Sequence, residues 1–266
     1  MALMEFELCI KPESNLTIWR YMSLEKFESI LSNCALFFCR ADRFSDPFEG
    51  SIPRLEAENR YDALQQMSSI YFNSELNPAD AQTNINAISS LHRKFKKQHI
   101  INCWHINNTE NDSMWRLYLK SNAGVAIQTT IEKLEKAFSK TKEKINYSKV
   151  RYLNYENDIW YDVNDYPIQS YNMFIPLVHK RIEFKQEAEI RLIHFIETED
   201  NLDKFWKFQP FSNGMNINVE VNELIDIVHA SPTSDIDQIS KIQEIIKQYG
   251  FNFKVLKSGL TTNPYY

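Results

Sequence analysis

The sequence predicts an α+β fold in which a single mixed sheet is flanked by helices. Short runs of β-branched and aromatic residues, typical of strands, recur along the chain between segments with helical apolar periodicity. A polar helical pair at about residues 54–98 interrupts this alternation, and about residues 224–258 have the pattern of a βαβ unit. Because no linker or shift in composition is visible, we expect one domain over residues 1–266.

The first two predicted strands surround a short helix. The segment Thr17–Met22 predicts a strand that leads into a helix with Ser23 at its N-cap. A second strand is predicted at Ala35–Phe44 and ends in the turn SDPFEG. The inserted helical segment breaks near Pro78 into two helices. The second helix ends in the basic run HRKFKKQH, which we interpret as a solvated helix face.

The middle of the chain predicts four further strands. They are His99–Asn107, Gly124–Thr130, the segment INYSKVRYLNY that begins at Ile145, and Glu189–Ile196. A short helix carrying Met114, Trp115 and Tyr118 follows the first, and the amphipathic helix IEKLEKAF follows the second. The stretch from Asn157 to Lys180 is expected to be helical after Pro167.

The C-terminal unit is the clearest part of the pattern. Leu224–Ala230 is an apolar strand, and the segment that begins at Ile236 carries isoleucines on one helical face until Gly250 ends it. The segment FNFKVLK predicts the next strand. Because a crossover helix joins the two strands, we expect them to be parallel.

The glycine content excludes several enzyme classes. The chain has five glycines, at positions 50, 124, 214, 250 and 259, and no two lie within six residues of each other. A dinucleotide fingerprint, a P-loop and a GxSxG nucleophile elbow all need closer glycines. The net charge of −5 also argues against a general nucleic-acid binder.

Cysteine and histidine patterns give no sign of a metal site. The four cysteines form no CxxC pair, and the six histidines form no HExxH motif, so we expect no metal. Buried thiols in a reducing cytoplasm are the simplest interpretation of the cysteines. The N-terminal segment lacks the basic region of a signal peptide, and no apolar run is long enough to span a membrane. We therefore expect a cytoplasmic protein without membrane contact.

Two carboxylates before the most strand-like segment are candidates for chemistry. Glu187 and Glu189 are two residues apart, so on an extended chain both would face the same side, followed by Arg191. Such a pair at the mouth of a cleft could stabilise a cationic sugar-like transition state or accept a proton. The alternative is a solvated strand end held by ion pairs.

Aromatic residues and one arginine suggest a ligand site. Trp104, Trp115 and Tyr118 could form a stacking wall for a planar ligand, although burial in the core would also explain them. Arg20 lies in an apolar strand beside Tyr21, and a guanidinium there binds phosphate or a carboxylate best.

An ordered set of motifs in this chain resembles a bacterial family, domain of unknown function twenty-nine seventy-one. The motifs are WRYMSLEKFESIL, ALFFCRADRFSDPFEG, CWH, SMWRLYLKSNAGVAI, KRIEFKQEAEIRLI, VHASP and VLKSGL. The resemblance runs from about Trp19 to about Leu260, and DPFE, MWxxY and ExExR are its most specific parts. The usual third motif, Cys-Phe-Ser, is Cys-Trp-His here, so His105 replaces the hydroxyl. The family pattern implies that Asp46 and Glu49 of DPFE lie near Arg20 or Arg191.

The order of these motifs also looks like that of ADP-ribosyltransferases. That resemblance implies NAD as the substrate and a small-molecule nucleotide as the partner. Arg20 and Tyr21 would hold NAD, and Trp104 and Tyr118 would frame its nicotinamide. Glu189 would be catalytic and Glu187 would orient the acceptor, whose identity stays open. The activity implied is ADP-ribosyl transfer or NAD glycohydrolysis.

Two other functions remain open. The first is a non-catalytic binding or regulatory module, in which the same motifs are structural ion pairs and core residues. The second is a metal-dependent nuclease that uses Glu183 and Lys185 on a strand. Its metal carboxylates would be Asp158, Asp162 and Asp165.

Overall fold

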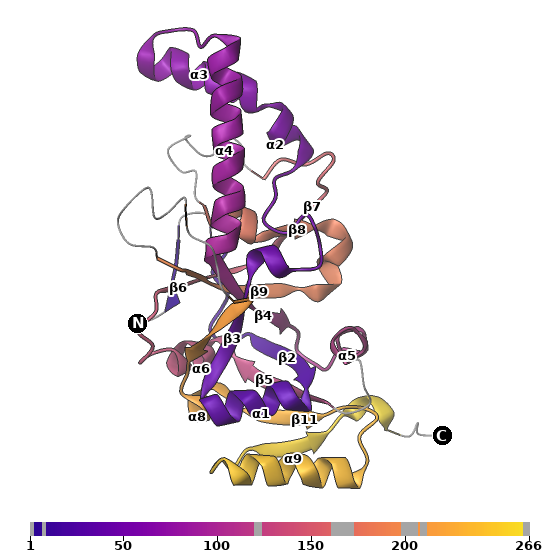
Figure 1. Cartoon of the computed structure of the whole chain (residues 1–266). Coiled ribbons are helices and arrows are strands. Elements are labelled where there is room, and N and C mark those ends of the chain that lie inside the picture. Colours follow the sequence, from indigo (N-terminus) through magenta and orange to yellow (C-terminus); the bar gives the residue numbers. More distant parts are fainter. Residues whose placement is uncertain are drawn as a thin grey trace.

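The structure is a computed structural model that describes residues 3–6, 9–119, 124–160, 173–197, 207 and 212–262, apart from the side chain of Tyr71. It has an α+β fold with a large mixed sheet flanked by helices, so the predicted fold class is confirmed (Figure 1). Ten strands of the described part form this sheet, and two more form a separate small sheet.

Four antiparallel strands form the middle of the large sheet. They are β9 (Glu189–Phe195), β4 (His99–Ile106), β2 (Thr17–Ser23) and β5 (Gly124–Thr130), in that spatial order. One edge continues through β6 (Ile145–Lys149) to β1 (Leu3–Met4). The other edge continues through β11 (Ile227–Ala230) to β12 (Lys254–Lys257), while β3 (Ala35–Arg40) joins β4 and β10 (Gly214–Asn218).

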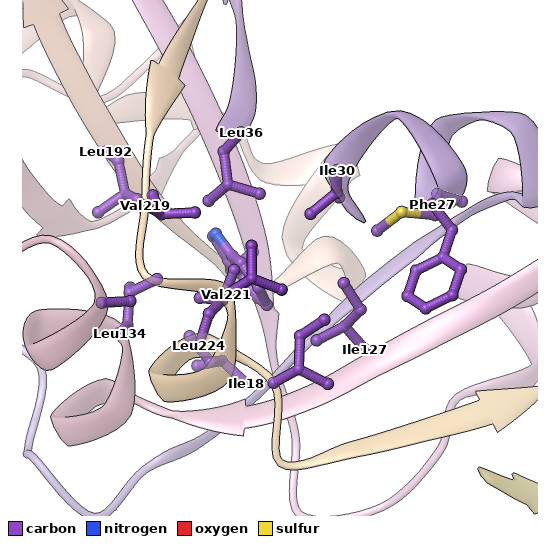
Figure 2. Close-up of a cluster of buried hydrophobic side chains, with 14 of the residues drawn as sticks. Ile18, Phe27, Ile30, Leu36, Ile127, Leu134, Leu192, Val219, Val221 and Leu224 are labelled. Atoms are coloured by element: carbon purple, nitrogen blue, oxygen red, sulfur yellow. The ribbon is translucent and has the colours of Figure 1, made fainter. Parts of the chain in front are cut away.

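Helices cover one face of the sheet and bury its main core. They are α1 (Leu24–Asn33), α6 (Ile131–Ala137), α8 (Val221–Leu224) and α9 (Ile236–Gln248). Their apolar side chains meet those of the strands, as Ile30, Leu134, Leu224, Ile18 and Ile127 do in Figure 2. Because successive strand residues point to opposite faces, Trp19 and Tyr21 lie on the other face, where they pack against α5 (Asp112–Tyr118).

A helical arm extends away from the sheet between β3 and β4. It consists of α2 (Arg54–Glu58), α3 (Arg60–Phe72) and α4 (Pro78–Gln98), and Figure 1 shows α3 and α4 at its far end. The predicted break at Pro78 is present, and a second break at Asn59 separates α2 from α3. None of the helices in the described ranges is long and apolar enough to cross a membrane.

The C-terminal βαβ unit matches its prediction closely. Strands β11 and β12 are parallel, with Val228 paired to Val255. Asp235 forms a capping box with Gln238 at the start of α9, and Gly250 follows its end with a φ of 79°. The strand begins later than predicted, at Ile227, because Leu224 belongs to α8.

The predicted long strand from Ile145 is wrong, because it is divided at Val150. Its first part is β6, while β7 (Arg151–Leu153) pairs in parallel with β8 (His179–Arg181) in the small sheet. The strand predicted at Ala35–Phe44 ends at Arg40, where the short helix η1 (Ala41–Arg43) begins. Most of the helix predicted after Pro167 lies outside the described residues; η3 (Ile175–Leu177) and β8 occupy the part that is described.

Candidate functional site

Five charged side chains form a buried ion cluster on the α5 side of the sheet. They are Glu49, Lys180, Glu187, Glu189 and Arg191, and each is less than 9 % exposed. Lys180 lies at the centre. Its Nζ donates to Glu187 Oε2 at 2.8 Å and to Glu189 Oε1 at 2.9 Å, and it is 3.4 Å from Glu49 Oε1. The cluster therefore joins the DPFE turn to β8 and the ExExR motif.

Arg191 has partners for its whole guanidinium group. It donates to both oxygens of Glu49 at 2.8 and 2.9 Å, to Glu189 Oε2 at 2.7 Å and to the Leu177 carbonyl at 2.7 Å. The predicted proximity of Glu49 to Arg191 is thus present. Asp46 instead accepts two hydrogen bonds from Arg181, at 2.9 and 3.2 Å.

The two glutamates reach the same lysine through a turn and not through an extended strand. Glu187 is the last residue of the short helix η4 (Ile182–Glu187), and β9 starts only at Glu189. Between them Ala188 has a φ of 38°, a left-handed conformation that is rare for a residue with a side chain. The hydrogen bond from the Ile106 amide to the Ala188 carbonyl, at 2.8 Å, holds this turn against β4.

The environments of the two glutamates separate their pKa values. Burial, together with the hydrogen bond and the charge of Glu189, raises the pKa of Glu187 to about 7. Burial would also raise the pKa of Glu189, but Arg191, the hydrogen bond from Glu187 and Lys180 hold it well below its usual value. At neutral pH Glu189 is therefore held ionised, whereas the Glu187 carboxyl group can gain or lose a proton.

His105 connects the backbone of Glu187 to α5. Its Nδ1 donates to the Glu187 carbonyl at 2.7 Å, which leaves Nε2 to accept from Asn111 Nδ2 at 3.4 Å. Burial lowers the pKa of His105, in keeping with a neutral ring. Asn111 is in turn the N-cap of α5, and its side chain accepts from the Met114 amide.

Tyr118 and Arg20 are two further residues that the sequence predicts to bind a ligand. Tyr118 ends α5 and is 42 % exposed, and its hydroxyl has no hydrogen-bond partner among the described residues. Burial of the hydroxyl and the nearby Cys103, Glu189 and Glu187 raise its pKa.

Arg20 lies where β2 separates from β4. The two strands pair only at Ile18 with Ile106 and Trp19 with His105. Beyond that point Arg20 Nη1 bridges the gap, donating to the Cys103 carbonyl at 2.5 Å and to Asn102 Oδ1 at 3.0 Å. Within the described part of the chain, the other guanidinium nitrogens have no hydrogen-bond partner.

A family model matches the part of the chain that carries most of this site. Residues 114–192 match the family described as Protein of unknown function (DUF2971). This match confirms the predicted resemblance to that family over these residues. No curated protein matches the chain. The DUF2971 segment holds Tyr118, Lys180 and the ExExR residues, whereas Glu49, Arg20 and His105 lie before it.

Three aromatic residues that the sequence analysis named as ligand-site candidates are buried in the interior. Trp104 is 1 % exposed within the main core, and its Nε1 donates to Asn102 Oδ1 at 2.8 Å. Trp115 is 2 % exposed and bonds to Glu110, and the hydroxyl of Tyr21 accepts from the Asn111 amide. Packing and internal hydrogen bonds explain their presence.

The residues of the nuclease alternative do not form its expected strand. Glu183 and Lys185 belong to η4, a short 3-10 helix. Asp158 accepts a hydrogen bond from the Asn154 amide, while Asp162 and Asp165 lie outside the described residues. The described ranges contain no group of three or more His, Cys, Asp or Glu residues that could hold a metal ion.

Lys180 and His105 are candidate site residues that the sequence analysis did not single out. Lys180 stands seven residues before Glu187 in KRIEFKQE, and only the turn through η4 brings its amine back to the glutamates. His105 is paired with Glu189 across β4 and β9. The partner strand of His105 is distant in the sequence, so local patterns could not predict this contact.

Proposed function

We propose that the chain cleaves the nicotinamide–ribose bond of NAD, as an NAD glycohydrolase or an ADP-ribosyltransferase-like enzyme. The observation that carries this proposal is the pair of adjacent glutamates with separated pKa values, one held ionised and one near 7. Pairs of titratable groups whose environments separate their pKa values are typical of acid–base sites.

The charges of the cluster favour Glu187 as the group that meets the reacting ribose. Cleavage of the bond develops positive charge on the ribose, which a carboxylate stabilises. Both oxygens of Glu189 already accept hydrogen bonds from cations, Lys180 and Arg191. When Glu187 loses its proton, it shares Lys180 with Glu189 and Glu49, so the five residues then carry three acids against two cations. We therefore give Glu187 the role that the resemblance gave to Glu189, and Glu189 positions it.

Tyr118 and Arg20 supply the binding groups of the proposal. Tyr118 is 42 % exposed and has no hydrogen-bond partner for its hydroxyl among the described residues, and Arg20 keeps guanidinium N–H groups that suit a phosphate of the dinucleotide. The acceptor is water for glycohydrolysis or a macromolecular group for transfer. All four cysteines are free thiols, which supports the proposed cytoplasmic location.

The test incubates the protein with NAD, with and without EDTA, and measures the nicotinamide released by chromatography. The wild-type protein should release nicotinamide in both conditions. Glu187→Gln should slow release by about a hundred- to a thousandfold, the usual loss when a preorganised transition-state interaction is removed. Glu183→Gln changes an exposed carboxylate of the same short helix and should keep the wild-type rate. Cleavage that EDTA abolishes would contradict the proposal.

A non-catalytic binding module is the second candidate, favoured by one observation. Glu49, Glu189 and Arg191 saturate one another's hydrogen bonds inside the protein, as structural ion pairs do. Under this alternative the wild-type protein releases no nicotinamide, and Glu189→Gln only lowers the melting temperature.

A further inference from the structure

The C-terminal motifs VHASP and VLKSGL contribute no side chain to the buried ion cluster, yet they contact the segment that leads into α5. The Gly259 amide of VLKSGL donates to Glu110 Oε1 at 2.8 Å. His229 of VHASP lies beside the same carboxylate, with its Nδ1 3.8 Å from Glu110 Oε1. The other oxygen, Oε2, accepts from Trp115 Nε1 at 3.1 Å. Glu110 therefore joins the C-terminal unit to α5.

Asn111, the next residue, connects Glu110 to the ring of His105. Its backbone amide donates to the Tyr21 hydroxyl at 3.0 Å, and its side-chain oxygen caps α5 by accepting from the Met114 amide at 3.3 Å. Because that oxygen faces Met114, the side-chain nitrogen Nδ2 is the group that faces His105 Nε2, at 3.4 Å. The Asn111 side chain therefore links the start of α5 to His105.

The Asn111 amide decides which ring nitrogen of His105 carries the hydrogen. The Glu187 carbonyl can only accept, so Nδ1 must be protonated to donate to it at 2.7 Å. A neutral ring then accepts at Nε2, and Asn111 is the donor in the described part of the chain. Without that donor, the ring can carry its hydrogen on Nε2 instead, which removes the bond to the Glu187 carbonyl.

The bond from His105 matters because the turn at Glu187 has an unfavourable backbone conformation. Ala188 follows Glu187 with a φ of 38°, and such conformations persist only where the surroundings hold them. Two bonds from β4 do so, one from His105 Nδ1 to the Glu187 carbonyl and one from the Ile106 amide to the Ala188 carbonyl. Loss of the first bond would let the Glu187 carboxylate move from its contact with Lys180.

We propose, on the basis of the proposed NAD cleavage, that the C-terminal motif VLKSGL positions the Glu187 carboxylate. The connection runs through Glu110, Asn111 and His105, which are positioning residues that act through Glu187. With only seven residues, α5 is too short to be stable without tertiary contacts, so the contacts at its N-terminal end fix the place of Asn111. The C-terminal βαβ unit thereby controls the geometry of the site from outside the ion cluster.

Gly259→Pro breaks the connection at its C-terminal end, because proline has no amide hydrogen to donate to Glu110. Gly259 starts the short helix η5 (Gly259–Thr261), where proline is tolerated, and Ser258 before it has the extended backbone that proline requires. Gly259→Ala is the matched control, since it keeps the amide, and its β-carbon would lie 3.7 Å from Glu110 Oε1, an ordinary contact. Glu110→Ala removes the same contact from the other side and replaces the proline variant if that variant does not fold.

Asn111→Ser breaks the connection at its other end. Serine caps a helix about as well as asparagine, so α5 keeps its N-cap, but the shorter side chain does not reach His105 Nε2. The ¹⁵N chemical shifts of the His105 ring at pH 8 report its tautomer without any NAD. The wild type and Gly259→Ala should carry the hydrogen on Nδ1, whereas Gly259→Pro and Asn111→Ser should show a mixture that includes the Nε2–H form.

Nicotinamide release gives the kinetic result. Gly259→Pro and Asn111→Ser should each lower kcat about ten- to a hundredfold with little change in KM, because they misplace a reacting group. The double variant should be no slower than the slower single variant, because both changes interrupt one connection.

The two readouts separate this inference from the proposed function. A wild type that releases no nicotinamide, together with the expected His105 spectra, would contradict the proposed function and support the positioning of Glu187. A His105 spectrum that neither Gly259→Pro nor Glu110→Ala changes, or that Gly259→Ala changes equally, would overturn the inference. So would a double variant whose loss of kcat is the product of the two single losses.

Discussion

Arg191 holds both oxygens of the Glu49 carboxylate, at 2.8 and 2.9 Å, although the two residues are 142 positions apart in the sequence. Both side chains are almost fully buried, and the pair joins the DPFE turn to the middle of β9. This contact therefore connects two motifs that the sequence showed separately. Lys180, Glu189 and Glu187 are arranged around this ion pair.

Removal of Glu49 should strongly destabilise the protein. Glu49→Ala leaves Arg191 buried with one carboxylate fewer, and the loss of one partner from a buried ion pair typically costs about 3–5 kcal/mol. Glu156→Ala is the control, because Glu156 pairs with Arg54 at an exposed site, where such pairs contribute about 0–1 kcal/mol. Urea unfolding at pH 7 measures both. Equal losses in the two variants would show that burial of the Glu49 pair contributes nothing.

Glu187→Gln should stabilise the protein at pH 8. The pKa of Glu187 is raised from 4.5 to about 7, so the folded state binds this proton more tightly than the unfolded chain. Stability therefore falls as the pH rises from about 4.5 to 7, and the ionised side chain remains unfavourable above 7. Glutamine stays neutral and avoids this cost, which is on the order of 1–3 kcal/mol.

Thermal unfolding at pH 5 and pH 8 measures this effect. The variant and the wild type should be similar at pH 5, and the variant should melt higher at pH 8. A gain in stability with a loss of activity is the pattern expected of a site residue. A variant that is less stable than the wild type at both pH values would contradict the raised pKa.

Glu189→Gln should have the opposite effect on stability. The pKa of Glu189 is held well below its usual 4.5, so its contribution is present above about pH 4.5 and is lost as the pH falls toward the folded value. At pH 7 the variant should unfold at lower urea than the wild type, and the difference should shrink below pH 4.5. A difference that does not change with pH would mean that packing, and not charge, accounts for the loss.

At position 188, glycine should be the one replacement for alanine that does not lower the stability of the protein. The φ of 38° at Ala188 places it in the left-handed region, where a β-carbon costs roughly 1–2 kcal/mol and glycine avoids that cost. Ala188→Gly should therefore be at least as stable as the wild type. Ala188→Val should be destabilised by more than about 1 kcal/mol, because a branched side chain fits this region poorly. Denaturant titration compares the three proteins, and equal midpoints would show that the turn is not strained.

The fold was predictable where local patterns decide it. Asp235, the isoleucine stripe and Gly250 mark the beginning, the buried face and the end of α9, and all are features of adjacent residues. The division of the strand from Ile145 was not predictable, because alternation continues through Val150. There the chain leaves one sheet for another to hydrogen-bond with Glu189 and Val178. Those partners are distant in the sequence.

The site was predictable only in part, for a similar reason. The motifs identified Glu49, Glu187, Glu189 and Arg191, which the structure brings together. Composition could not show that Trp104 points into the core while its neighbour His105 faces the glutamates. That distinction depends on which face of β4 the helices cover, a property of the assembled sheet.

The pH dependence of nicotinamide release from NAD tests the central proposal most directly. If ionised Glu187 stabilises the developing positive charge, the wild-type rate should rise through about pH 7 and then level off. Glu187→Gln should be at least about a hundredfold slower at pH 8 and show no such step. A wild-type protein that releases no nicotinamide at any pH, or a Glu187→Gln variant with the wild-type rate and profile, would contradict the proposal.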